Sequence, residues 1–345
     1  MALSGAWDRA RNNSNNHLIP WKHLEESSIV VTGSTGLIGS QFVRSILQYT
    51  HYNDANIRLI LPVRNLEKAK SLFGEQPNIK YVSWVMGEAF PDLVEGDYFV
   101  HAACPTSSDA FLHRPVEIIS DIFKSTEAVV ELLKTKKFKS CIYLSTMEVY
   151  GDIEGKAVES KNGSIDTMNP RSSYPEAKRL SECMFASAAA EYDLHICVLR
   201  LAQTFGIGVP EYDGRVFAEF GRCILDGKDI VLYSDGAKRN PYLSVDDAVS
   251  AIVYLMAFGK AGEAYNAANP STYCSVLEMA QMLISEFGND GIDLVFGSDV
   301  ERSKSFRQGN VLNLDCSKLL NLGWIPVDSL KDMYLSMFSG WMEHV

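Results

Sequence analysis

The feature that most constrains how this chain folds is a turn near its beginning that contains three regularly spaced glycines. The turn follows the short apolar run Ile29-Val30-Val31 and contains Gly33, Gly36 and Gly39. An amphipathic pattern continues after it to about Leu47. This order predicts a buried strand, a tight turn and a helix, which together form the first unit of a dinucleotide-binding fold.

Each glycine of the turn has its own expected role. The first permits the sharp change of direction, the second lets the backbone approach a pyrophosphate, and the third lets the helix pack on the strand. The helix N-terminus adds free N–H groups and a partial positive charge. We therefore expect a dinucleotide to contact the residues of this turn, which are Gly33, Ser34, Thr35, Gly36, Leu37, Ile38 and Gly39.

Apolar and amphipathic segments alternate well beyond the turn. Further strands are expected at 58–63, 79–85, 98–103, 141–146 and 195–200, with helices at 115–135 and 174–192. Such alternation predicts an α/β fold with a doubly wound parallel, Rossmann-type sheet, whose ligands bind beyond the carboxyl ends of the strands. Ala102 and Ala103 follow the fourth strand, and their small side chains leave room for a cofactor there.

Beyond about residue 200 the expected loops lengthen and short helices intervene. We interpret residues 1–27 as an N-terminal extension, in which Leu18 and Trp21 pack on the domain edge. Residues 28–200 are expected to form the dinucleotide-binding domain. Residues 201–345 are expected to form a smaller C-terminal substrate-binding lobe, interleaved with returns to the main sheet.

The composition excludes several classes of partner. The 345 residues carry a net charge of −11, which argues against binding to nucleic acid. No apolar run is long enough to span a membrane, and the polar N-terminus lacks a signal peptide, so we expect a cytoplasmic protein. The seven cysteines are scattered and form no CxxC pair, which is typical of free thiols rather than of a metal site.

The end of the second strand bears on the choice of cofactor. A dinucleotide fold often has an acidic residue there for the ribose hydroxyls, but this chain has Arg64. A guanidinium can instead pair with a 2′-phosphate through two hydrogen bonds. We therefore expect NAD(P), with Arg64 favouring NADP. The alternative is a solvated surface arginine.

A tyrosine and a lysine suggest acid–base chemistry. Tyr174 and Lys178 are four residues apart on an expected helix and so share one face. The ammonium group would lower the pKa of the phenol, which could then act as a base toward a hydroxyl or as an acid toward a carbonyl. An ordinary surface pair is the alternative. Thr146, at the end of the fifth strand where ligands bind, and the glycine turn both weigh against that alternative.

Taken together, the glycine turn, the segment 145–151 and the helix bearing Tyr174 and Lys178 resemble the extended short-chain dehydrogenase/reductases. The resemblance covers about residues 28–345 and is strongest to the NAD(P)-dependent nucleotide-sugar epimerases, dehydratases and decarboxylases. It implies that Tyr174 is the catalytic base and that Lys178 assists it and holds the nicotinamide ribose. It also implies that Thr146 hydrogen-bonds the substrate.

The same resemblance implies further contacts. Gln203 and Arg239 stand where members of the family contact the sugar diphosphate or the sugar. The helices 115–135 and 174–192 are expected to form a homodimer. Glu88 and Ile122 depart from the family's pattern, which has Asp and Asn at these positions.

Met147 and Glu148 bear on the reaction that the resemblance implies. The family's dehydratases use a glutamate at the position of Glu148 as the base at C5, and its decarboxylases also carry one there. Many dehydratases place an aspartic acid at the position of Met147 to protonate the departing C6 hydroxyl, and a thioether cannot donate a proton. We expect a nucleotide-diphospho-sugar to react through a transient 4-keto intermediate, in a reaction of the epimerase/dehydratase type with Glu148 as the candidate C5 base.

Three alternatives for the function stay open at this point. They are a nucleotide-sugar decarboxylase of the UDP-glucuronate type, a net NADPH-dependent carbonyl reductase and a non-catalytic cofactor-binding protein. Glu148 could instead have a structural role, paired with Arg171 or Lys178. We expect His101 to pack beside the cofactor and assign it no proton transfer.

Overall fold

The computed structural model describes residues 19–105, 111, 113–289, 291–297 and 312–342, so Leu18 lies outside the described residues. Its main element is a seven-stranded sheet in the order β3-β2-β1-β4-β5-β7-β11, in which every neighbouring pair is parallel. The strands are β1 (Ser27–Thr32), β2 (Ile57–Val63), β3 (Ile79–Ser83), β4 (Tyr98–His101), β5 (Ser140–Thr146), β7 (Ile196–Leu201) and β11 (Ala264–Ala267). The order reverses between β1 and β4, so the expected doubly wound sheet is confirmed and its ligand crevice lies there.

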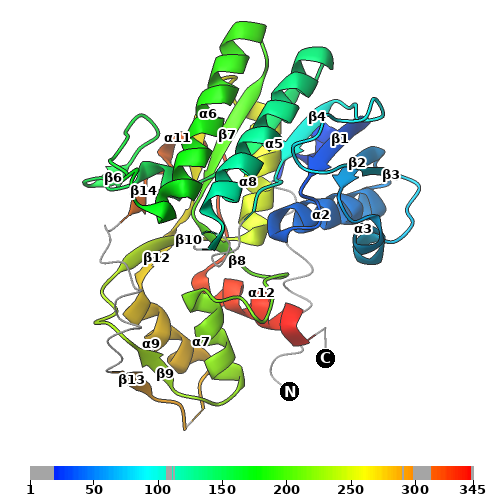
Figure 1. Cartoon of the computed structure of the whole chain (residues 1–345). Coiled ribbons are helices and arrows are strands. Elements are labelled where there is room, and N and C mark those ends of the chain that lie inside the picture. Colours follow the sequence, from blue (N-terminus) through cyan, green and yellow to red (C-terminus); the bar gives the residue numbers. More distant parts are fainter. Residues whose placement is uncertain (1–18, 106–110, 112, 290, 298–311, 343–345) are drawn as a thin grey trace.

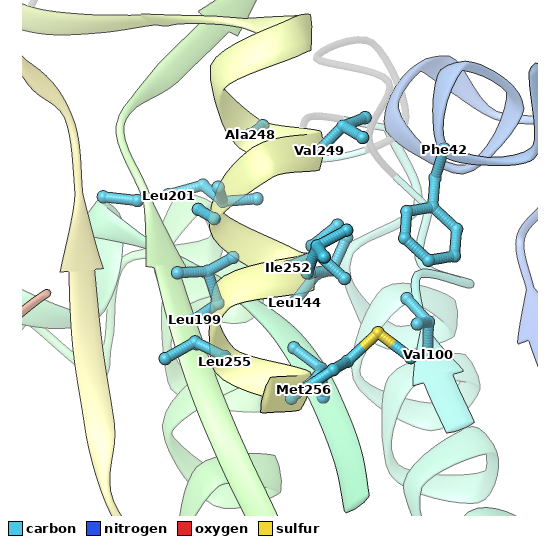
Figure 2. Close-up of a cluster of buried hydrophobic side chains, with 14 of the residues drawn as sticks. Phe42, Val100, Leu144, Leu199, Leu201, Ala248, Val249, Ile252, Leu255 and Met256 are labelled. Atoms are coloured by element: carbon cyan, nitrogen blue, oxygen red, sulfur yellow. The ribbon is translucent and has the colours of Figure 1, made fainter. Parts of the chain in front are cut away.

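Alternate residues of each strand supply two separate cores, one on each face of the sheet. On one face, β1 buries Ile29 and Val31 against α2, α3 and α8. On the other face, Val30 belongs to the core that α5 and α6 cover. These helices are α2 (Leu37–Asn53), α3 (Leu66–Phe73), α5 (Pro115–Thr135), α6 (Ser173–Tyr192) and α8 (Val245–Phe258). Figure 2 shows part of the first core, to which Phe42 of α2, Leu144 of β5 and Ile252 of α8 belong.

Helix α2 runs six residues beyond the expected end at Leu47 because its buried face continues. Tyr49 lies on that face and stacks on Trp21 of η2 (Trp21–Leu24), with ring centroids 5.4 Å apart. Asp54 then ends the helix in a left-handed conformation. Trp21 therefore packs against the main sheet's helix layer, as the sequence led us to expect.

The elements after β7 form a second core and also return to the main sheet. Helices α7 (Val216–Leu225), α9 (Val276–Phe287) and α12 (Leu330–Met342) enclose that core below the sheet (Figure 1). By contrast, α8 and β11 belong to the main sheet or its covering layer. The remaining elements are β6 (Lys156–Ala157), β8 (Gln203–Phe205), β9 (Ile230–Leu232), β10 (Arg239–Ser244), β12 (Asn269–Ser275), β13 (Leu294–Phe296), β14 (Asn313–Leu314), α11 (Ser317–Leu320), η3 (Met147–Tyr150) and η4 (Pro170–Ser172).

None of the helices in the described ranges has both the length and the apolar character that a membrane crossing requires. Within the same ranges, no three His, Cys, Asp or Glu side chains gather in a way that could hold a metal ion.

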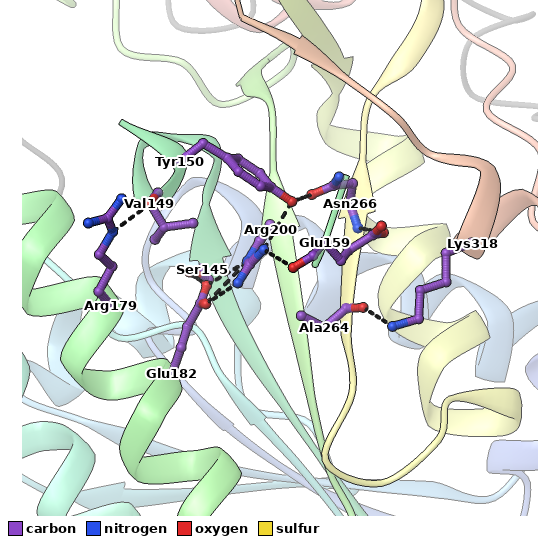
Figure 3. Close-up of polar contacts among 10 residues, drawn as sticks. All are labelled: Ser145, Val149, Tyr150, Glu159, Arg179, Glu182, Arg200, Ala264, Asn266 and Lys318. Carbon is purple, nitrogen blue, oxygen red and sulfur yellow. Dashed lines mark hydrogen bonds and ion pairs between the residues drawn. The ribbon is translucent and has the colours of Figure 1, made fainter. Parts of the chain in front are cut away.

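A buried polar network locks α6 to the sheet (Figure 3). Glu182 of α6 accepts hydrogen bonds from the Ser145 hydroxyl of β5 (2.5 Å) and from the Arg200 guanidinium of β7 (2.7 Å). Arg200 also donates to the Tyr150 hydroxyl, which in turn donates to the Asn266 side chain of β11. The network fixes how far α6 can slide or rotate over β5.

Removing one charge from this network should destabilise the protein strongly. The Glu182→Ala variant leaves the Arg200 guanidinium in a site where its side chain is only 10% exposed, without its carboxylate partner. We expect the free energy of unfolding to fall by about 3–5 kcal/mol, measured by chemical denaturation. Glu131→Ala breaks an exposed pair with Lys134 on α5 and should cost less than about 1 kcal/mol. Equal losses in the two variants would contradict this account of the network.

Candidate active site

A cavity of about 320 Å³ opens at the carboxyl ends of β1, β4 and β5. It brings together residues that are far apart in the sequence. Those that the sequence singled out are Gly33, Gly36, Leu37, Ile38, Gly39, Ala102, Thr146, Glu148, Tyr174, Lys178 and Gln203. The crevice between β1 and β4 is where a parallel sheet of this order binds its ligands.

The glycine turn forms one wall of the cavity, and its geometry tolerates no side chain at two positions. Gly33 has a φ of +69°, and a Cβ there would lie 2.5 Å from the carbonyl carbon of Ala102. A Cβ on Gly39 would lie 2.3 Å from the Gly33 carbonyl oxygen. Ser34 is fully buried, and Thr35 is half-buried at the turn. The turn thus draws the backbones of β1, β4 and α2 into close contact.

Gly36 is exposed and stands at the N-cap of α2, so the helix's free N–H groups open toward the cavity. A Cβ on Gly36 would lie 3.3 Å from the Gly33 carbonyl oxygen, a tighter contact than most Cβ atoms make. Ala103 follows Ala102 directly, and its backbone nitrogen closes against Gly33. These residues fit the pyrophosphate of a dinucleotide, which such a helix N-terminus binds without a side chain.

Three of the four candidate catalytic side chains lie close together on the cavity wall. Tyr174 and Lys178 lie one turn apart on α6, and Thr146 ends β5 beside them. The Lys178 ammonium donates a hydrogen bond of 2.6 Å to the Leu144 carbonyl, which anchors this face of α6 to β5. The Thr146 hydroxyl accepts the Glu148 N–H and so caps η3.

The expected low pKa of Tyr174 does not hold in this structure. Burial raises the pKa of Tyr174 and Cys104 adds to the rise, whereas the Lys178 ammonium opposes it. The sequence showed the lysine but not the depth of burial, to which the ring of Phe111 contributes by stacking on Tyr174 at 4.4 Å. Tyr174 is therefore protonated at neutral pH in the structure as it stands.

Glu148 lines the cavity but is not a free carboxylate. Its Oε2 lies 3.0 Å from Arg171 Nη2, so the pairing with Arg171 that the sequence left open is the one present. The Arg171 guanidinium also lies over the ring of Phe111, 5.0 Å from its centroid. Met147 lines the same wall. An ion pair, an aromatic ring and a thioether thus surround the place where a substrate would meet Thr146.

The structure places Gln203 and Arg239 at different sites. Gln203 lines the cavity, but Arg239 is not among the residues that line it. The register of β8 and β10 pairs Gln203 with Tyr242, so Arg239 lies three residues further back along β10. There it forms an ion pair of 2.8 Å with Glu278 of α9. A substrate contact for Arg239 remains a prediction.

Arg64 and His101 also lie outside the cavity wall. Arg64 is exposed and directly follows β2 at its carboxyl end. Because β2 pairs in parallel with β1, this is the same end of the sheet at which β1 leads into the glycine turn. His101 is buried and contacts the Thr32 hydroxyl through Nδ1 at 2.8 Å. Burial, together with the Lys178 charge, lowers the pKa of His101 to about 3, so the ring is neutral and suits a packing role.

The sequence reasoning missed Arg215, which also lines the cavity. It stands at the N-cap of α7, and Asp213 holds its guanidinium through both carboxylate oxygens, with distances of 3.0 Å and 2.6 Å. The stretch Asp213-Gly214-Arg215 before an apolar helix was the available signal. Phe111 and Cys104 line the cavity as well and were not proposed as site residues.

Comparisons with known proteins agree with this architecture. The model of the NAD dependent epimerase/dehydratase family matches residues 29–268. UDP-glucuronic acid decarboxylase 1 of Xenopus tropicalis is 27% identical over 327 residues, covering 91% of this chain and 72% of the relative. dTDP-glucose 4,6-dehydratase of Streptomyces niveus is 25% identical, covering 86% of this chain and 88% of the relative.

Solved structures share the fold at lower identity. UDP-glucuronic acid 4-epimerase from Bacillus cereus, in complex with UDP-glucuronic acid and NAD, has a TM-score of 0.74 at 18% identity, covering 92% of this chain and 100% of that one. UDP-glucose 4-epimerase from Thermotoga maritima, with UDP-glucose, has a TM-score of 0.73 at 22% identity, covering 92% and 99%. With the family model matching well over half of its length, the chain belongs to the NAD dependent epimerase/dehydratase family of extended short-chain dehydrogenase/reductases.

Proposed function

We propose that this chain converts a nucleotide-diphospho-sugar through a transient 4-keto intermediate, and that the sugar is a uronic acid that loses its carboxyl group. The observation that carries the first part is the meeting of Thr146, Tyr174 and Lys178 with the glycine turn in one cavity. The second part is supported by the Arg171–Glu148 pair in that cavity, by Met147, and by the UDP-glucuronic acid decarboxylases among the relatives.

The first chemical task falls to Tyr174, which would accept the proton of the sugar's 4-hydroxyl as that carbon is oxidised. Lys178 stabilises the phenolate, and the Thr146 hydroxyl orients the substrate oxygen. A bound NAD(P) supplies the redox chemistry and, when oxidised, a further positive charge near the phenol. Because burial raises the pKa of Tyr174, these two charges together have to offset burial before the tyrosine can act as a base.

The residues around Glu148 bear on the second chemical task. Once C4 is a ketone, a carboxylate on C5 stands β to it, and loss of CO₂ leaves the electron pair in the C4–C5 enolate. The enolate then takes up a proton from water at C5, which restores the C4 ketone. Decarboxylation needs no proton donor at C6, whereas loss of a C6 hydroxyl does. Met147 has no proton to donate, so it is compatible with the first reaction and not with the second. Arg171 offers a guanidinium to the sugar's carboxylate. Tyr174, now protonated, can return its proton to the C4 oxygen when the ketone is reduced again.

Epimerisation or dehydration, with Glu148 as the base at C5, is the second candidate. The place of Glu148 on the cavity wall favours it. However, Glu148 would have to give up its contact with Arg171 to take a proton.

A panel of nucleotide sugars tests the proposal. Incubation of the purified protein with UDP-glucuronate, UDP-glucose, dTDP-glucose and GDP-mannose should yield CO₂ and a UDP-pentose from the first, with no net formation of NAD(P)H. Conversion of a neutral hexose, with release of water or inversion, would favour the second candidate. Unchanged sugars, together with stoichiometric NADPH loss on a small ketone, would make the chain a reductase and contradict the proposal.

Tyr174→Phe tests the assignment of the base. Turnover should fall by about 10²- to 10⁴-fold, since the hydroxyl that moves the proton is lost, while the affinity for the dinucleotide changes little. Tyr192→Phe makes the same change at the end of the same helix, where the side chain is exposed, and should keep wild-type turnover. Wild-type turnover in the Tyr174→Phe variant would contradict the assignment of Tyr174 as the base.

We propose further that the chain prefers NADP, because the exposed Arg64 lies beyond β2 where a 2′-phosphate would reach it. Arg64→Ala should weaken NADP⁺ binding by about tenfold and leave NAD⁺ binding unchanged, measured by titration calorimetry. Arg58→Ala removes an exposed arginine from the opposite end of the same strand and should affect neither. A wild-type protein that binds NAD⁺ more tightly than NADP⁺ would refute the preference.

A homodimer through α5 and α6 is also proposed. The two helices pack side by side (Figure 1). Helix α5 exposes Val116, Ile119 and Phe123 at helical spacing, and α6 exposes Leu180. The double variant Ile119→Glu/Phe123→Glu should sediment as a monomer where the wild type sediments as a dimer. Phe296→Glu, at an exposed phenylalanine on β13, is the control. A monomeric wild type would end the proposal.

A further inference from the structure

The Lys178 ammonium is buried without an acidic partner. The residue is 2% exposed, and among the described residues no carboxylate lies within ion-pairing distance of it. Its hydrogen bond goes to the Leu144 carbonyl, and on another side it lies over the ring of Tyr143, 4.3 Å from the centroid. A desolvated ammonium over an aromatic face is a strong cation–π contact.

The ring of Tyr143 is rigidly held. It is 2% exposed on β5, with the Phe185 ring 4.7 Å away and the His101 ring stacked on it at 5.6 Å. A side chain packed on this many sides cannot follow the ammonium if it moves. It therefore presents a fixed surface to Lys178.

The titratable groups facing Lys178 come from three elements. His101 and Cys104 come from β4 and the loop after it, Tyr143 from β5, and Tyr174 from α6 itself. Burial lowers the pKa of His101 and raises the pKa of Cys104, Tyr143 and Tyr174, so all four are uncharged at neutral pH. The interactions that offset the cost of burying the Lys178 ammonium must therefore come from uncharged groups. The Tyr143 ring is such a group and lies directly against the ammonium.

We propose that Tyr143 is a positioning residue whose ring face holds the Lys178 ammonium beside Leu144, charged and within reach of Tyr174 and of the cofactor's ribose. The proposal rests on the proposed roles of Lys178 and Tyr174. Without the ring, the ammonium loses a contact that favours its charged form, and the field that opposes the raised pKa of Tyr174 weakens. The proton-accepting form of Tyr174 would then appear only at higher pH.

Replacement of the ring and retention of the ring give opposite expectations. In Tyr143→Leu, the affinity for NAD⁺ and NADP⁺, measured by calorimetry, should fall by about tenfold, because the ammonium is no longer held where the ribose meets it. The acid limb of the pH–rate profile for the sugar nucleotide that the wild type converts should move to higher pH. Tyr143→Phe keeps the aromatic face and should restore both.

Phe185→Leu is the matched control, since it removes an equally buried aromatic ring that touches Tyr143. Thermal unfolding of all variants shows whether each is folded. The proposal is overturned if Tyr143→Leu binds dinucleotide as Phe185→Leu does and keeps the wild-type pH profile. It is also overturned if Tyr143→Phe is as impaired as Tyr143→Leu, because the hydroxyl would then be responsible. The proposed function has its own test, because wild-type turnover in the Tyr174→Phe variant would contradict it whatever the Tyr143 variants show.

Discussion

The contact between α6 and β5 is the constraint on which the rest of the site depends. Tyr174, Lys178 and Glu182 follow one another at four-residue intervals along α6 and therefore share a face. Lys178 bonds to the Leu144 carbonyl and Glu182 to the Ser145 hydroxyl, which are consecutive residues of β5. Two bonds one turn apart fix both the height and the rotation of α6. Tyr174, one turn before Lys178 on α6, is thereby placed on the cavity wall beside Thr146.

The sequence predicted the main-sheet strands from β1 to β7 and the helices α2, α5 and α6, because local signals define them, but it did not predict the short helix α3. Buried parallel strands appear as short apolar runs, and α5 begins and ends at the expected residues since Pro115 starts it and its apolar face ends with it. The end of α2 could not be predicted, since it depends on Trp21, a residue outside the helix. The glycine turn was predictable because steric demands on a backbone appear directly as glycine.

The candidate site was predicted less completely, for reasons that lie in long-range contacts. The register between β8 and β10 separates Arg239 from Gln203, and no local pattern encodes that register. The pKa of Tyr174 is raised rather than lowered because residues such as Phe111, more than sixty positions away in the sequence, bury the side chain. Arg215 lines the cavity because Asp213 and the start of α7 aim it there. Among the described residues that line the cavity, three cationic side chains, Arg171, Lys178 and Arg215, stand against Glu148, although the chain as a whole is acidic.

The three glycines of the turn present main-chain groups to the cavity, and two of them, Gly33 and Gly39, cannot accept even a methyl group. Main-chain N–H groups at a helix N-terminus can bind a pyrophosphate but do not distinguish between the nucleosides that it joins. Under the proposed preference for NADP, selection between dinucleotides falls to a residue that no steric demand holds in place, the exposed Arg64 after β2. The part of the site that demands a fixed backbone and the part that is sterically free are then physically separate. A substitution at Arg64 would leave the close contacts of Gly33 and Gly39 unchanged.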